Sequence, residues 1–160
     1  MTLQELADKE DNLYSKVIEL SNQPQNGTTN TKLNEIFLEY KRIHKQYADI
    51  SSHNMEALKR GLFIQWYSLL EPKYLTGISE LDKNAEEKIV HVMNELIEAG
   101  EVDCELVWML NHYSNWGWAL QGLSDKFVSQ KNYPWPNNMT REEMKLRGQM
   151  GIYLNSLAVY

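Results

Sequence analysis

Two ionisable side chains interrupt apolar helical faces in the first third of the sequence. Glu10 lies between Leu6 and Leu13, and His44 follows Tyr40 by one helical turn. If these two segments pair antiparallel across the loop between them, positions 10 and 44 come to similar heights. Because burying either group alone would cost several kcal/mol, the sequence predicts a buried ion pair or hydrogen bond between Glu10 and His44. In a cleft such a pair would act as a general acid and base, and in a core it would be a structural contact.

An aromatic run from Leu106 to Leu120 contains three tryptophans, one tyrosine and one histidine. On a helical wheel Trp108, His112 and Asn115 lie opposite a core-facing stripe, where an exposed helix would carry charged residues. No Asp, Glu, Lys or Arg occurs between positions 106 and 124. Because a tryptophan has roughly 150 to 250 Å² of surface to bury, we expect this face to be covered. The cover is another helix of the chain, a second subunit or a ligand.

If a ligand covers this face, the chain has an aromatic cleft that binds a small molecule, and an acid–base pair beside it would make an enzyme. A concave pocket that joins the aromatic rings to a histidine would support this hypothesis, and solid packing there would remove it. Glu10 and His44 are the candidate polar groups. The candidate lining residues, which are also the candidates for an interface, are Trp66, Tyr67, Trp108, His112, Asn115 and Trp116.

No motif in the sequence specifies a metal, a nucleotide or a catalytic nucleophile. The His-Glu-x-x-His motif and paired Glu-x-x-His motifs are both missing, as are phosphate loops and dinucleotide fingerprints. His91 has Glu87 and Glu95 at i, i+4 spacing, but two ligands on one exposed helix bind a metal weakly. Cys104 is the single cysteine, which excludes an internal disulfide and agrees with a reducing cytoplasm. We therefore expect no metal and no cofactor, and an enzyme is the less favoured class.

The net charge of -6 is concentrated in one part of the chain. Residues 71–105 carry ten acids and three lysines, a pattern that repels phosphate backbones, so we expect no nucleic-acid partner. There is no apolar run of about 18 residues, so we expect no membrane-spanning helix. The first twenty residues carry acids and lack the basic start and apolar stretch of a signal peptide. These features together predict a cytoplasmic location.

Helical periodicity dominates the chain and predicts an all-α fold. We expect a single helical domain over residues 1–160, built as a mainly antiparallel bundle of five or six helices with the aromatic helix near its centre. An irregular segment is expected at about 124–139. The expected helices run from Thr2 to Leu20, from Asn30 or Thr31 to Ile50, from Asn54 to Leu70, from Asp82 or Asn84 to Ala99, from Asp103 to about Gly122, and from Thr140 to Leu157.

Capping residues indicate where several of these helices begin and end. Asp82 and Asp103 are suited to cap helix starts, and Gly100 is suited to a left-handed helix end. We therefore expect residues 82–122 to form a tight antiparallel helical hairpin.

The last helix opens with Thr140 and Glu143, which together form the capping-box pattern. Gly148 and Gly151 follow within it. Each glycine costs about 1 kcal/mol inside a helix, which indicates close packing or a bend at that place.

The leading functional hypothesis from the sequence is a non-catalytic cytoplasmic helical module that acts by protein association. The partner is a second copy of the chain or another protein. The alternative is the small-molecule-binding protein or enzyme with the aromatic cleft described above.

Overall fold

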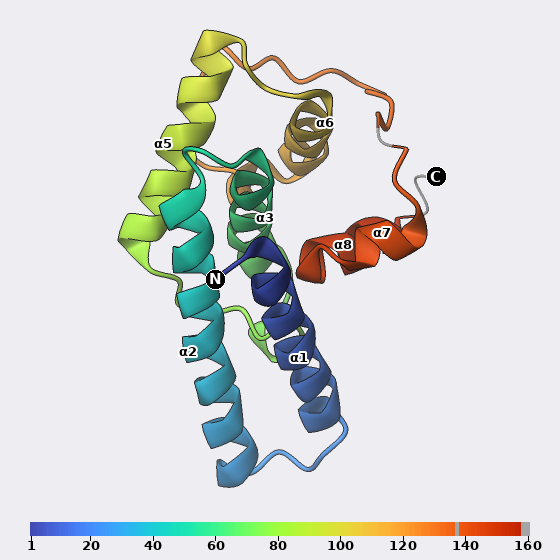
Figure 1. The fold of residues 1–160 in the computed structure, drawn as a ribbon. Coiled ribbons are helices and arrows are strands. Elements are labelled where there is room, and N and C mark those ends of the chain that lie inside the picture. Colours follow the sequence, from blue (N-terminus) through green and yellow to red (C-terminus); the bar gives the residue numbers. More distant parts are fainter. Residues whose placement is uncertain (137, 158–160) are drawn as a thin grey trace.

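The computed structural model describes residues 1–136 and 138–157, and every regular element in them is a helix (Figure 1). The expectation of an all-α, single-domain fold is confirmed. The described residues hold more helices than the five or six expected, because a short helix follows Pro72 and the last helix is divided. The elements are α1 (Leu3–Ser21), α2 (Gly27–Ile50), α3 (Met55–Leu70), α4 (Lys73–Thr76), α5 (Lys83–Ala99), α6 (Cys104–Tyr113), the 3-10 helix η1 (Ser114–Ala119), α7 (Arg141–Lys145) and α8 (Gly148–Ser156).

Helices α1 and α2 lie side by side and run in opposite directions (Figure 1). Helix α2 also contacts α3 and α5, and α8 packs against both α1 and α3. One apolar core therefore joins helices from the beginning and the end of the chain. Among its largest fully buried side chains are Trp66, Tyr40, Tyr47, Tyr113 and Phe63.

The start of α1 agrees with the sequence and the start of α2 does not. Thr2 caps α1 through a capping box with Glu5. Helix α2 begins at Gly27, three to four residues earlier than expected, because the Asn26 side chain accepts hydrogen bonds from the backbone N–H groups of Thr28 and Thr29 at 3.0 and 3.1 Å. An asparagine in an extended conformation satisfies two otherwise free helix donors, and the polar loop is shortened accordingly.

The predicted caps around α5 and α6 are confirmed, but the predicted hairpin is wrong. Asp82 and Asp103 cap the two helices, and Gly100 ends α5 with φ +69°. Figure 1 shows α5 along its length and α6 nearly end-on, so the two axes are far from antiparallel. Helix α6 ends at Tyr113, because the chain tightens into η1 and Trp116 leaves helical geometry with φ -121° and ψ 63°.

The predicted last helix is divided by a bend at Gly148. Thr140 and Glu143 form the expected capping box at the start of α7. Gly148 then adopts φ +64°, a left-handed conformation that a helix interior cannot contain. Gly151 lies against the backbone of Met144, where a Cβ atom would overlap the carbonyl oxygen. The two glycines thus provide the bend and the close packing that the sequence indicated.

The described part of the irregular segment contains no helix and crosses the molecule from η1 to α7 (Figure 1). Its start is held by Asn94 of α5, which donates to the carbonyl oxygen of Gly122 at 2.7 Å and accepts from the backbone N–H of Ser124 at 2.8 Å. These bonds fix the path by which the segment approaches α6.

Within the described residues, none of the helices combines the length and the apolar character needed to cross a membrane.

Candidate functional site

The uncharged face of α6 is largely covered by the chain itself. The His112 ring stacks on Trp108, with the centroids 5.0 Å apart and the planes 9° apart, and Trp135 of the irregular segment meets Trp108 edge-on at 4.6 Å. Nε2 of His112 lies 2.7 Å from the hydroxyl of Tyr153 in α8. The sequence allowed this face to be covered by the chain itself, by a second subunit or by a ligand. Over Trp108 and His112 the covering residues belong to the same chain.

Behind this face the aromatic side chains form a solid cluster. Trp66 of α3 stacks on Tyr113 at 4.2 Å and meets Trp116 edge-on at 5.6 Å. The ring centroids of Tyr67 and Tyr153 are 5.3 Å apart, on the α8 side of the cluster. Trp66 is only 1% exposed, so in this part of the predicted aromatic cleft the rings pack against one another as core.

A cleft of about 300 Å³ opens beside the cluster, between the end of α6 and the irregular segment. We call it the α6 cleft. Its walls are Trp108, Asn111, His112 and Asn115 on one side and residues 129–133 on the other. Three of the six predicted lining residues thus border one cavity, whereas Trp66, Tyr67 and Trp116 are not part of its walls.

Asn111 holds the two walls of the α6 cleft together. Its amide donates to the carbonyl oxygen of Val107 at 2.9 Å, and its oxygen accepts the backbone N–H of Gln130. The buried amide thereby satisfies its own hydrogen-bonding groups and fixes the irregular segment at a defined distance from the helix. Nothing in the sequence indicated this contact, because residues 111 and 130 meet only in the folded chain.

Few charges border the α6 cleft. No acidic side chain occurs among the described residues of its walls, and Lys131 is the one lysine there. Burial lowers the pKa of His112 below its ordinary value of 6.5, which favours a neutral imidazole at pH 7. The cleft therefore offers mainly uncharged hydrogen-bonding groups together with the rims of aromatic rings.

Glu10 is buried as expected, but the predicted bond to His44 is wrong. Its carboxylate accepts the hydroxyls of Tyr40 at 2.9 Å and Tyr47 at 2.6 Å, and the backbone N–H of Gln149 at 3.4 Å. Burial raises the pKa of Glu10 to about 7, although the tyrosine hydroxyls act in the opposite direction. The physical reason for the error is rotation: α2 turns its tyrosines, and not its histidine, toward α1.

His44 lies in a different part of the core. Its Nε2 is 2.9 Å from Oε1 of Gln65 in α3, and its Nδ1 has no hydrogen-bond partner among the described residues. Burial lowers the pKa of His44 to about 4. Neither His44 nor Glu10 borders the α6 cleft, so the structure does not bring the two proposed polar candidates to the candidate site.

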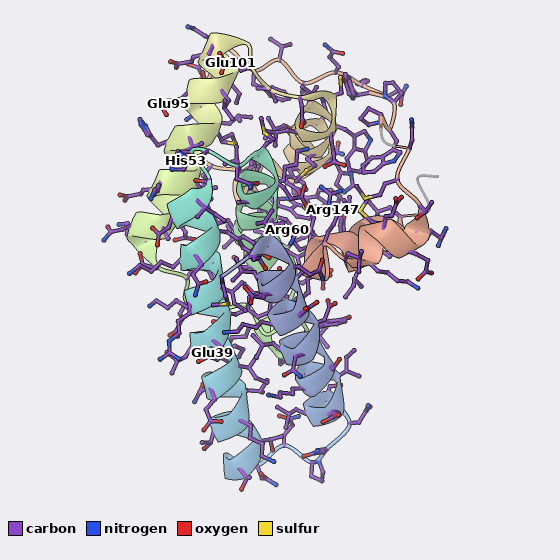
Figure 2. The ribbon with its side chains drawn as sticks, in the orientation of Figure 1. Glu39, His53, Arg60, Glu95, Glu101 and Arg147 are labelled. Carbon is purple, nitrogen blue, oxygen red and sulfur yellow. The ribbon has the colours of Figure 1, made fainter. Side chains whose placement is uncertain are left out.

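A largely buried ionic network joins α3, α6 and Arg147, the residue that precedes α8, and the sequence interpretation missed it. Arg147 donates to Glu56 at 2.6 and 2.7 Å and to Glu105 at 2.5 and 3.0 Å, while Lys59 contacts Glu105 at 3.0 Å. Against the effect of burial, Arg147 and Lys59 lower the pKa of Glu105 to about 2. In Figure 2, Arg60 and Arg147 lie in the interior, between α1 and the start of α8.

One signal in the sequence could have revealed this network. Lys59 and Arg60 are adjacent within a stretch of α3 that is otherwise apolar, and both are nearly buried. Two buried cations require acidic partners, which are Glu105 of α6 for Lys59 and Glu56 of the same helix for Arg60. The network ties the chain at the start of α8 to α3 and α6, so we interpret it as structural.

Metal ligands do not gather in the described part of the chain, where no three His, Cys, Asp or Glu side chains are placed to hold an ion. His91 is exposed and lies 3.3 Å from Glu95 on the same helix face. Cys104 is exposed at the start of α6.

The chain matches no protein-family model, no curated protein and no solved structure. The candidate site therefore rests on the geometry of this chain.

Proposed function

We propose that this chain is a binding protein for a small molecule, which it holds in the α6 cleft. The observation that carries the proposal is the position of His112. Its ring borders the cleft, stacks on Trp108 and reaches the hydroxyl of Tyr153 at 2.7 Å. Small-molecule sites commonly combine such an aromatic wall with a few fixed polar groups.

Rigidity of the walls supports the same proposal. Trp108 is 9% exposed and held between His112 and Trp135, so its ring is fixed before a ligand arrives. Asn111 fixes the opposite wall through Gln130. A site whose walls are already ordered loses little conformational entropy on binding.

Tryptophan fluorescence and thermal shift against a metabolite library test this proposal, because Trp108 lies in the wall of the cleft. We expect at least one saturable ligand whose signal is lost in His112→Gln. His91→Gln, an exposed histidine on α5, is the matched control and should bind as the wild type does. A library without a ligand, or a ligand bound equally by His112→Gln, would contradict the proposal.

Protein association is a second candidate, supported by a separate apolar groove of about 710 Å³ between α2 and α4. Phe37 lines it beside Tyr74 and Leu75, which are 56% and 45% exposed. The partner would be another copy of the chain or a different protein, in the cytoplasm. Light scattering over a range of concentrations tests self-association, and a monomer throughout would leave only a different partner.

A further inference from the structure

The polar groups around the α6 cleft are mostly ones that both donate and accept hydrogen bonds. Asn115, Gln130 and Asn132 carry amides and Ser129 carries a hydroxyl, and all four residues are exposed at the cleft. An amide presents its N–H and C=O groups side by side. Ligand hydroxyl groups suit this arrangement, because each hydroxyl also donates and accepts.

The electrostatics of the α6 cleft favour neither sign of ligand charge. A cationic ligand would find no acidic side chain among the described residues of the walls. An anionic ligand would find Lys131, but that lysine is exposed to water, where a single ion pair contributes little. A charged ligand would thus lose hydration without gaining a matched ionic partner.

The rings of the α6 cleft add a limited apolar surface. Trp108 and Tyr133 both border it, and Trp108 is fixed edge-on to Trp135. Ring surfaces of this kind pack against the C–H groups of a small carbon skeleton. With a volume of about 300 Å³, the cleft suits a compact ligand and not a long chain.

From this combination of amides, aromatic rings and few charged groups we infer that the α6 cleft binds an uncharged polyhydroxylated ligand of about monosaccharide size. The inference rests on the proposed function and adds the chemical class of the ligand.

Matched sugars that differ in charge test the ligand class on the full chain. The probes are D-glucose, D-mannose and myo-inositol, with D-glucuronate and D-glucosamine as their acidic and basic counterparts, followed by tryptophan fluorescence and saturation-transfer NMR. We expect at least one neutral probe to bind about tenfold more tightly than either charged counterpart, with little dependence on salt.

The outcomes separate this inference from the proposed function. Tighter binding of glucuronate or glucosamine, or library ligands that are all charged or all apolar, would overturn the polyol assignment and leave the binding function standing. Failure of the sugars and of the whole library would overturn both.

A pair of amide variants locates the binding. Asn115→Ala removes an amide that borders the cleft, and it should weaken the neutral sugar about fivefold, as expected for one lost hydrogen bond. Asn84→Ala removes an exposed amide at the start of α5 and should bind as the wild type does. Thermal melts of both variants check that they fold. Equal sugar affinity of Asn115→Ala and Asn84→Ala would overturn the assignment to this cleft.

Discussion

Glu10 and His44 lie in the same core, yet neither is the partner of the other. Glu10 accepts the hydroxyl of Tyr47 at 2.6 Å, and His44 faces Gln65 at 2.9 Å. Burial raises the pKa of Glu10 to about 7 and lowers that of His44 to about 4. At pH values between their ordinary pKa values of 4.5 and 6.5, both groups are neutral in the folded chain and charged in the unfolded chain.

These two pKa shifts change the free energy of unfolding in opposite directions as the pH rises. The folded pKa of Glu10 is above its ordinary value, so its stabilising contribution is complete below pH 4.5 and is lost as the pH rises to about 7. The folded pKa of His44 is below its ordinary value, so its contribution is complete above pH 6.5 and is lost as the pH falls to about 4. Between pH 4.5 and 6.5 one contribution falls with pH as fast as the other rises, so their pH dependences cancel.

Single variants should therefore reveal a pH dependence that the pair conceals. Relative to the wild type, the unfolding free energy of Glu10→Gln should rise with pH between 4.5 and 6.5, by about 1.4 kcal/mol per pH unit. That of His44→Leu should fall by a similar amount. Urea unfolding followed by circular dichroism measures both slopes. Slopes are compared because other groups, such as His112, titrate in the wild type and in both variants. Equal slopes in all three proteins would disprove the predicted charge states of Glu10 and His44.

Gly148→Ala should destabilise the fold by about 2–4 kcal/mol. Residue 148 has φ +64°, and a Cβ atom there would overlap the carboxylate of Glu10. Gly27→Ala is the control, because no atom lies within 4 Å of its added Cβ, and it should change stability by less than about 0.5 kcal/mol. Urea midpoints compare the two variants. Similar midpoints would show that the core relaxes around residue 148.

Arg147→Lys should also be costly, although it keeps the positive charge. Arg147 reaches Glu56 and Glu105 with several N–H groups at once, and a single ammonium cannot keep both pairs of bonds. We expect a loss of about 2–4 kcal/mol in the free energy of unfolding. The control is Arg42→Lys, an exposed residue paired with Glu39, where the change should stay within about 0.5 kcal/mol. A loss no larger than that of the control would show that the network is dispensable.

Asn111→Ala should loosen the irregular segment. The variant loses the oxygen that accepts the backbone N–H of Gln130 and leaves that donor without its bond. Lys131 follows directly and is exposed, so trypsin should cleave there about tenfold faster under native conditions. Mass spectrometry of the fragments measures the rate. Asn84→Ala should be cleaved like the wild type, and an unchanged rate at Lys131 in Asn111→Ala would assign the order of the segment to other contacts.

Helix ends were predictable where their causes are local. Asp82 and Asp103 cap the helices that they precede, and Thr140 forms its capping box with a residue three positions later. Such caps depend on neighbours within one turn of chain. The break of the helix at Trp116 was not predictable in this way, because Trp116 belongs to an uncharged pattern that resembles a helix. Its edge-on contact is with Trp66, which lies on another helix.

The candidate site was predictable on one side only. The helical wheel correctly grouped Trp108, His112 and Asn115, because residues on one helix face share their surroundings. The opposite wall, residues 129–133, has no periodicity, and its place depends on Asn111. The tyrosine partners of Glu10 were missed for a related reason, since the rotation of α2 about its own axis is set by packing and not by spacing in the sequence.

The bond from the backbone N–H of Gln149 to Glu10 joins residues 139 positions apart. A ribosome makes α1 first. At ~5–20 residues per second, Gln149, the last residue that donates a hydrogen bond to Glu10, is made roughly 7 to 28 seconds later. Until then Glu10 of the nascent chain lacks the part of its surroundings that α8 provides. The apolar surface that α8 covers in the folded chain is also exposed during this time. The folding of this domain is therefore completed only after translation has passed residue 149.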